Sequence, residues 1–248
     1  MLMPFTLPTD DEKHTYVHAQ FERIARRYDL TNDVISFGMH RIWKAKAVDI
    51  MMQPAEGAGE PRKFLDVCCG TGDLAIEIAK RVNLIDQVTG LDFSSNMLKV
   101  AEARTKTAHQ KKIINWVQGD AQNLPFEDNE FDGAIISFGL RNLVDIKKGL
   151  SEMARVVKSK KHVVNLDLGS PQGFIFAPAF NTFFRYVVPV IGSVLQNDRD
   201  AYTYLPESKK NYPDPDEITG YFEAAGMENV QHKPLAGGSV ALHYGRVL

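Results

Sequence analysis

The sequence predicts an α/β fold with a mostly parallel seven-stranded sheet, and three observations favour it. Short apolar segments alternate with segments of helical periodicity along residues 63–168. The first apolar segment runs into a turn with two glycines, Gly70 and Gly72, and a helical pattern follows. Two C-terminal apolar segments are joined through Gly237 and Gly238, which is typical of a hairpin. Such alternation implies a sheet with helices on both faces.

An N-terminal helical part is predicted before this core. Residues 1–15 are polar and are expected to be frayed, and helices are expected over residues 16–52. Apolar side chains recur there at helical spacing, as at Phe21, Ile24, Ala25 and Tyr28. Asn32-Asp33 and Ser36-Phe37-Gly38 are expected to interrupt the helical pattern. Residues 53–61 contain two glycines and two prolines and predict a linker.

The elements of the core follow in a regular order. Strands are predicted at 63–69, 87–93, 113–118, 131–138 and 162–168, and helices at 73–82, 94–105 and 146–158. Ser94 is placed to cap its helix. A helix at 215–225 and strands near 228–234 and 239–247 complete a single domain, residues 1–248.

Residues 170–210 form an insertion with an apolar segment at 174–195. This segment is nearly long enough to span a membrane, but Arg185 interrupts it, and Pro178 and Pro189 are expected to break a helix. A buried cap helix is one interpretation. An apolar wall for a lipophilic substrate, or a face that rests on a membrane, is the other.

Composition excludes several classes of function. The formal net charge of −2 provides no broad cationic surface for nucleic acid. The two cysteines, Cys68 and Cys69, are adjacent and indicate neither a disulfide framework nor a metal site. No cluster of His, Cys and Asp has the spacing of metal ligands. The N-terminus lacks the pattern of a secretory signal.

The glycine turn predicts a site for a nucleotide-like cofactor, and nearby carboxylates bear on which one. Asp92 ends the second strand, at the spacing of an acid that holds ribose hydroxyls. The glycine turn and Asp92 suit NAD and S-adenosylmethionine equally well. Asp66 and Asp73 flank the turn and would repel a pyrophosphate, whereas S-adenosylmethionine brings cationic groups. Asp120 ends the third strand, where it could accept a hydrogen bond from an adenine amino group.

Several motifs along the chain are similar to one enzyme family. They are Tyr28 to Asp33, Gly38 to Lys44, Gly70 to Asp73, Gly139-Leu140-Arg141-Asn142, Ala201 to Ser208 and Leu235 to His243. On these residues the chain resembles the UbiE/MenG/COQ5 family of quinone C-methyltransferases, most closely its phylloquinone branch. The family usually has Lys-Pro-Gly-Gly where this chain has Lys158-Ser159-Lys160-Lys161. A residue with a Cβ in the left-handed conformation there would cost about 1 kcal/mol.

The resemblance implies a class I, Rossmann-like methyltransferase that transfers a methyl group from S-adenosylmethionine to a ring carbon of a prenylated demethylnaphthoquinol. It places the cofactor at Thr71, Asp92, Asp120, Ala121 and Ser137, with Gly70 and Gly72 shaping the turn, and the charge argument adds Asp66. Arg141 and Asn142 are expected at the reacting centre. Tyr28 and Asp29 are expected to close the site, and Tyr202, Tyr204 and His243 to line it for the substrate.

The expected partners are a lipophilic quinol, a membrane surface and a second copy of the chain, with no nucleic acid. The cytoplasm or the plastid stroma is the expected location. Alternatives stay open at this point. They are methylation of a benzoquinol precursor or of another small molecule, an NAD-linked oxidoreductase, and a non-catalytic scaffold.

Overall fold

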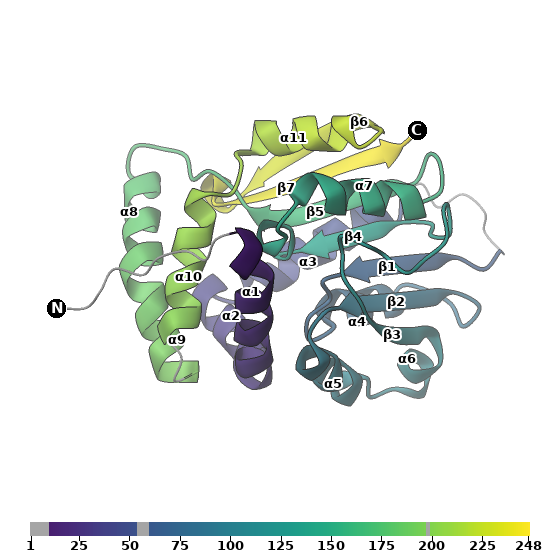
Figure 1. Cartoon of the computed structure of the whole chain (residues 1–248), viewed down its shortest axis with the longest axis horizontal. Helices are drawn as coiled ribbons and strands as arrows, with labels where there is room; N and C mark the ends of the chain where they lie inside the picture. The colour runs from purple at the N-terminus through teal and green to yellow at the C-terminus, as the bar shows by residue number, and fades with distance from the viewer. Residues whose placement is uncertain (1–9, 54–59, 197–198) are drawn as a thin grey trace.

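The computed structural model describes residues 10–53, 60–196 and 199–248, and it contains a seven-stranded sheet of order β3-β2-β1-β4-β5-β7-β6 (Figure 1). The strands are β1 (Lys63–Val67), β2 (Gln87–Asp92), β3 (Ile114–Gln118), β4 (Ala134–Ser137), β5 (His162–Leu168), β6 (Met227–Leu235) and β7 (Val240–Val247). Strands β1 to β5 are parallel, and β7 is antiparallel to both β5 and β6. The mostly parallel sheet and the C-terminal hairpin are thereby confirmed.

Helices pack on both faces of the sheet, as predicted. The helices with the clearest packing are α3 (Met39–Met51) and α4 (Asp73–Ala79) on one face, and α7 (Ile146–Val156) and α11 (Pro215–Ala224) on the other. Consecutive strand residues point to opposite faces, so Ile135 packs with Val48 while Ile136 packs with Leu150. Each face therefore has its own apolar core.

The N-terminal part is helical earlier and more continuously than expected. Its elements are α1 (Asp10–Ile24), a short 3₁₀ turn η1 (Ala25–Arg27) and α2 (Tyr28–Ser36), followed by α3. Residues 10–15 are helical, so the prediction of a frayed segment was wrong for them. Asn32, Asp33 and Ser36 lie inside α2, so the predicted interruption was wrong for them, and Phe37 and Gly38, both left-handed, separate α2 from α3. Most of the predicted linker, residues 54–59, lies outside the described residues.

Two capped helices connect β2 to β3. In α5 (Ser95–Arg104), the Ser94 hydroxyl accepts a hydrogen bond from the Met97 amide at 3.2 Å, as predicted. Helix α6 (Ala108–Ile113) was missed by the sequence analysis. The signal was a capping box, in which Thr107 and Gln110 satisfy each other's backbone amides.

The insertion folds into helices beside the N-terminal helices. Its elements are α8 (Phe176–Thr182), a π-helical turn η3 (Phe183–Val187), α9 (Val188–Gln196) and α10 (Arg199–Lys210). The prediction that prolines break this segment was wrong. Pro178 lies in the first turn of α8, where its missing N–H costs nothing, and Pro189 follows the π turn. Figure 1 shows α8 and α9 in line, with α10 alongside. Among the described residues, no helix has the length and apolarity to cross a membrane.

The turn before β5 carries the strain expected from its departure from the family pattern. Lys160 has φ = +65°, and its amide donates to the Val247 carbonyl at 2.8 Å. We expect Lys160→Gly to raise the free energy of unfolding by about 1 kcal/mol, because glycine adopts this conformation without a Cβ clash. Chemical denaturation measures the change. Lys161→Gly is the control, since a stabilisation there would show that the left-handed geometry is not the cause.

Candidate functional site

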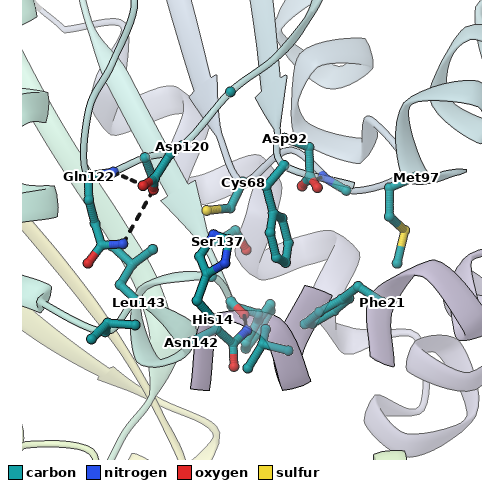
Figure 2. A pocket seen from close by; sticks show the side chains of 18 of the residues that line it. His14, Phe21, Cys68, Asp92, Met97, Asp120, Gln122, Ser137, Asn142 and Leu143 are labelled. Atoms are coloured by element: carbon teal, nitrogen blue, oxygen red, sulfur yellow. Dashed lines mark hydrogen bonds between the residues drawn. The ribbon is translucent and has the colours of Figure 1, made fainter. Parts of the chain in front are cut away.

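A pocket opens where the carboxyl ends of β1, β2, β3 and β4 meet, which is where open α/β sheets bind ligands (Figure 2). Helix α1 covers it from the opposite side. The side chains and glycines that line the pocket include His14, Val17, Phe21, Tyr28, Cys68, Gly70, Asp92, Phe93, Met97, Asp120, Ala121, Gln122, Ser137, Phe138, Asn142 and Leu143. Six of the predicted cofactor and catalytic residues therefore meet here: Gly70, Asp92, Asp120, Ala121, Ser137 and Asn142.

Asp92 is the acid at the centre of this pocket. Its carboxylate accepts the Gly70 amide at 2.8 Å and the Ser94 amide at 2.9 Å, so it fixes the glycine turn and the start of α5 together. The side chain is only 4% exposed. Burial disfavours the charged form and raises the pKa of Asp92 to about 6. A ligand whose hydroxyl groups donate hydrogen bonds to this carboxylate would stabilise its charged form.

The two glycines of the turn serve different purposes. Gly70 has φ = +54°, and a Cβ built there would meet no atom within 4 Å, so its face is open to a ligand. Gly72 has φ = +81°, and a Cβ there would lie 2.4 Å from the Trp116 ring. At Gly72 the missing side chain therefore makes room for Trp116 and not for a ligand.

The acids that flank the turn do not face the pocket. Asp66 is 1% exposed; one carboxylate oxygen accepts the Ala75 amide at 2.9 Å, and burial raises its pKa to about 8. Asp73 pairs with Lys44 at 2.9 Å and with Arg104 at 2.5 Å. Burial opposes ionisation of Asp73, but the two cations outweigh it and hold its pKa well below the usual value. The argument that both acids repel a pyrophosphate is thus wrong.

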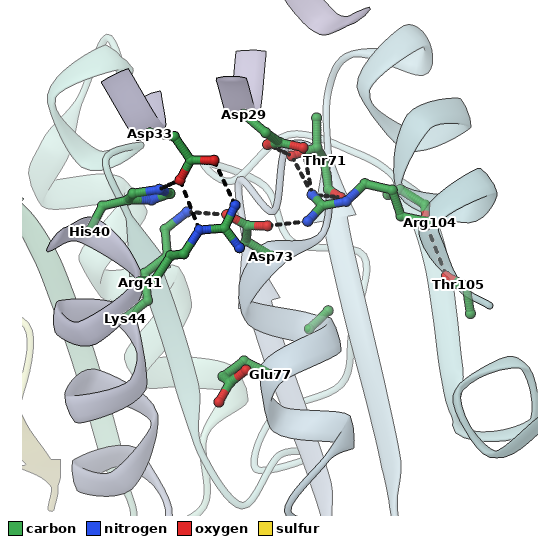
Figure 3. Close-up of polar contacts among 12 residues, drawn as sticks. Asp29, Asp33, His40, Arg41, Lys44, Thr71, Asp73, Glu77, Arg104 and Thr105 are labelled. Carbon is green, nitrogen blue, oxygen red and sulfur yellow. Dashed lines mark hydrogen bonds and ion pairs between the residues drawn. The ribbon is translucent and has the colours of Figure 1, made fainter. Parts of the chain in front are cut away.

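An ionic network ties the N-terminal helices to the glycine turn (Figure 3). The Thr71 hydroxyl donates to Asp29 at 2.5 Å, and Arg104 contacts Asp29, Asp73 and the Thr71 carbonyl. Thr71 is 2% exposed and does not line the pocket. Its observed contacts fix the turn against α2. Asp29 does not line the pocket, and its part in closing the site stays a prediction.

Two further polar groups reach the pocket from β3 and β4. The Asp120 carboxylate accepts the backbone amide and the side-chain amide of Gln122, which orients it beside Ala121. The Ser137 hydroxyl is buried and has no hydrogen-bond partner among the described residues. An unpaired buried hydroxyl is costly, so Ser137 is a group that a bound ligand would satisfy.

Arg141 lies just beyond the pocket, in a short turn (Leu140–Asn142) that follows β4. Its guanidinium donates to the Asp167 carboxylate at 2.7 Å and to the Phe138 carbonyl at 2.6 Å, and the side chain is 6% exposed. Burial opposes the charge, but Asp167 outweighs it and raises the pKa of Arg141. Asn142 donates to the same Phe138 carbonyl at 3.3 Å.

A second, apolar cavity adjoins the pocket. It is bounded by α2, α3 and the insertion, and Tyr28 and Phe138 line both spaces. Its empty volume, including space that is open to solvent, is about 670 Å³. Its lining residues include Ile35, His40, Trp43, Arg141, Leu168, Phe180, Phe183, Phe184 and Leu205. A ligand that spans both spaces would place a polar ring near Arg141 and an apolar chain among the phenylalanines.

The remaining predicted substrate residues do not all lie at the site. Tyr204 is 2% exposed, borders Arg141 and Asn142, and donates to Asn142 at 3.4 Å. The side chain of Tyr202 lies outside the described residues. His243 was predicted to line the site, and this is wrong. It is 1% exposed on β7, stacks on Phe222 and contacts the Pro215 carbonyl at 3.0 Å, so it belongs to the core under α11.

Sequence reasoning missed the contribution of α1. His14, Val17 and Phe21 line the pocket, and Glu22 accepts hydrogen bonds from the Ser94 hydroxyl at 2.7 Å and the Asn96 amide at 3.1 Å. The recurrence of apolar residues at helical spacing was the available signal, but it does not specify what the helix covers. The long-range contact between Glu22 and Ser94 determines where α1 lies and what it covers.

A comparison with protein families matches residues 9–247 to the ubiE/COQ5 methyltransferase family. The chain is 42% identical to the demethylmenaquinone methyltransferase of Staphylococcus carnosus over 229 residues, 92% of each chain. It is 41% identical to that of Bacillus subtilis over 235 residues, 95% of this chain and 98% of the relative.

Solved structures of methyltransferases share the fold at low sequence identity. An S-adenosylmethionine-dependent methyltransferase from Thermotoga maritima has a TM-score of 0.60 and 18% identity, covering 93% of this chain and 99% of that one. A Haemonchus contortus phosphoethanolamine N-methyltransferase, solved with S-adenosylmethionine, has a TM-score of 0.57 and 16% identity, covering 82% of this chain and 52% of that one. These likenesses concern the fold.

Proposed function

This chain belongs to the ubiE/COQ5 methyltransferase family, and we propose that its substrate is a prenylated demethylnaphthoquinol, methylated at a ring carbon. The apolar cavity beside the cofactor pocket carries this proposal. Its phenylalanine-rich wall suits a prenyl chain, and the shared residues Tyr28 and Phe138 would place the ring between the two spaces.

The chain is an S-adenosylmethionine-dependent methyltransferase, and the first pocket has groups that fit this cofactor. Asp92 would accept the ribose hydroxyls, Asp120 and Ala121 would meet the adenine, and the open face of Gly70 leaves room along the turn. The unpaired hydroxyl of Ser137 gives a further polar contact. When bound, S-adenosylmethionine supplies an electrophilic methyl group. The family excludes the alternative of an NAD-linked oxidoreductase.

The residues around Arg141 would prepare the quinol for methylation. A ring carbon becomes a strong nucleophile when a neighbouring hydroxyl loses its proton. The Arg141 guanidinium is held by Asp167 and the Phe138 carbonyl, and it would stabilise the resulting negative oxygen. The apolar wall excludes water, which favours a step in which opposite charges are neutralised.

An assay with purified protein tests the proposal. Demethylnaphthoquinol with a short prenyl chain, kept reduced and supplied with S-adenosylmethionine, should give the ring-methylated product by mass spectrometry. A demethylated benzoquinol precursor of equal chain length is the comparison, and its preferential methylation would contradict the naphthoquinol assignment. Phytyl- and menaquinol-type chains in the same assay decide whether the phylloquinone branch is the right one.

The outer side of the insertion is a candidate for contact with a lipid surface. The insertion carries several exposed large apolar or aromatic side chains, among them Phe174 (97%), Ile175 (79%), Val194 (74%), Tyr186 (62%) and Val190 (55%). The inner side of the same helices walls the apolar cavity. Since a prenylated quinol resides in a bilayer, we propose that this face rests on the membrane surface and admits the substrate.

We expect the double variant Phe174→Ser/Ile175→Ser to lose most of its co-sedimentation with phosphatidylglycerol vesicles, because it removes much of the apolar area. Its methylation of a short-chain quinol should stay within about twofold, since neither residue lines the apolar cavity. Leu84→Ser/Ile85→Ser, which changes an exposed apolar pair elsewhere, is the control. Loss of a dimer in analytical ultracentrifugation, with vesicle binding unchanged, would contradict the lipid contact and favour a second copy.

A further inference from the structure

The apolar cavity contains one buried basic group that the mechanism above does not use. His40 lies in the first turn of α3, is 3% exposed and lines the cavity with Tyr28 and Arg141. Its Nε2 atom is 2.8 Å from the Asp33 carboxylate. Its other ring nitrogen, Nδ1, is buried and has no hydrogen-bond partner among the described residues.

Asp33 determines which ring nitrogen carries the proton. Arg41 holds both oxygens of the Asp33 carboxylate through two hydrogen bonds, at 2.8 and 2.7 Å, and one of these oxygens is the one that His40 contacts (Figure 3). The bonds from Arg41, more than those from His40, lower the pKa of Asp33 to about 2, so the carboxylate is charged. A charged carboxylate at Nε2 requires the proton there, which leaves a lone pair on Nδ1.

The surroundings of His40 keep the imidazole neutral. Burial lowers its pKa, the positive charge of Lys44 lowers it further, and the hydrogen bond and charge of Asp33 together with Asp73 act in the opposite direction. Arg41 is the further charged group that shares Asp33. A neutral imidazole with a free lone pair, oriented by a carboxylate, is the arrangement of a general base.

The other titratable side chains described along this cavity are less suited to accept a proton. Arg141 is cationic and paired with Asp167. Tyr28 carries a phenol hydroxyl with no cation bonded to it among the described residues, and Tyr204, which lies near Arg141 in the adjoining space, has its pKa raised by burial to about 12. His40 is therefore the group on this wall that combines a free lone pair with neutrality.

We propose that His40, oriented by Asp33, accepts the hydroxyl proton of the quinol through Nδ1. This inference rests on the proposed function. The proton moves to Nδ1, and the electron pair that it leaves on oxygen is delocalised to the ring carbon. That carbon forms the new C–C bond while the S–C bond of the donor breaks and its electron pair stays on sulfur. The ring carbon then loses a proton to water, the electron pair of that C–H bond restores the aromatic ring, and His40 returns its proton to the oxygen.

Arg141, Arg41 and His40 have different roles because they lie at different positions around the cavity. Arg141 stabilises the negative oxygen without taking a proton, whereas His40 takes the proton without carrying a permanent charge. Arg41 acts only through Asp33, since it is exposed and does not line the cavity, so it is a positioning residue.

The test replaces His40 with glutamine, whose amide can still donate to Asp33 but offers no basic nitrogen at the Nδ1 position. We expect kcat for a short-chain demethylnaphthoquinol to fall by about 10²- to 10⁴-fold. The KM of the quinol and the Kd of S-adenosylhomocysteine should change by less than about threefold. The acid limb of the kcat/KM pH profile should be lost with the imidazole, and added imidazole should partly restore kcat to His40→Ala.

His162→Gln is the matched control. His162 is also a buried histidine whose pKa is lowered by burial, but it contacts the Gln53 carbonyl and lies at the opposite end of β5 from Asp167. Its replacement should leave kcat within about twofold. A kcat that His40→Gln retains, in a protein for which the wild type makes product, would overturn the base and leave the proposed function intact. No product from the wild type would contradict the function itself.

A measurement without turnover decides the matter if His40→Gln fails to fold. In the wild-type protein, ¹⁵N NMR should show His40 with its proton on Nε2. A redox-stable 2-prenyl-1-naphthol has the same donor hydroxyl, and its binding should shift the Nδ1 resonance as the hydrogen bond forms. Bound naphthol that leaves the Nδ1 resonance unmoved, or a proton found on Nδ1, would disprove the assignment.

Discussion

Replacing Arg141 with alanine is expected to lower the free energy of unfolding by roughly 3–5 kcal/mol. The guanidinium is buried and neutralises Asp167, which is 1% exposed and bonds to both the side chain and the backbone amide of Arg141. Removing the cation leaves Asp167 with an uncompensated buried charge. Urea denaturation of the variant and of the wild type measures the difference.

The double variant Arg141→Met/Asp167→Leu is the informative companion. It removes both charges, so most of the lost stability should return, although methyl transfer should not. A single Arg141→Ala variant as stable as the wild type would show that the ion pair contributes little. This matters for catalysis as well, because a loss of kcat in Arg141→Ala is attributable to chemistry only when folding is measured on the same sample.

Replacing Asp92 with asparagine is expected to raise the Kd for S-adenosylmethionine by about 100-fold or more. A hydrogen bond to a charged group contributes about 1.5–3 kcal/mol, and two ribose hydroxyls would donate to this carboxylate. The variant also presents an N–H to the Gly70 or Ser94 amide, which the carboxylate accepts in the structure. Isothermal titration calorimetry measures the affinity.

Asp86→Asn is the matched control for Asp92→Asn. Asp86 is 2% exposed, accepts the backbone amides of Arg62 and Asn83, and precedes β2 at the end opposite to Asp92. Its replacement should reduce stability and leave the affinity unchanged. An Asp92→Asn protein that binds the cofactor as the wild type does would remove Asp92 from the site.

The pH dependence of the affinity gives an independent check on Asp92. Burial raises the pKa of its carboxyl to about 6 in the free protein, and hydroxyl donors would lower it in the complex. Affinity should thus be constant above pH 7 and fall by up to tenfold per pH unit below 6. The slope should vanish in Asp92→Asn, where no carboxyl titrates.

The features that could be predicted from sequence are those fixed by local patterning. The strand, glycine turn and helix around Gly70, the acid at Asp92 and the cap at Ser94 depend on neighbours in the chain, and all three were placed correctly. The family motifs pointed to Arg141, which lies beside this pocket, but they did not show that Asp167 holds its charge. The role of Arg141 at the reacting centre stays a prediction.

The features that escaped prediction depend on contacts between distant residues. Asp73 was read as facing a ligand because it follows Gly72, but Lys44 and Arg104 come from α3 and α5 to neutralise it. His243 was read as a site residue because it belongs to a motif, but α11 covers it. Sequence spacing specifies which side chains are near in the chain, and not which helix lies over them.

The π turn at Phe183–Val187 constrains how the insertion can vary in length. Each residue added to an α-helix advances it by about 100°, so the wider turn sets the rotation of all that follows. Phe184 and Val188 are both buried against the N-terminal helices, while Val190 and Val194 point outward. Deleting one residue from the α-helix after this turn would rotate all that follows by about 100°, enough to carry buried side chains out of their contacts. Side chains in this segment can therefore change more freely than its residue count.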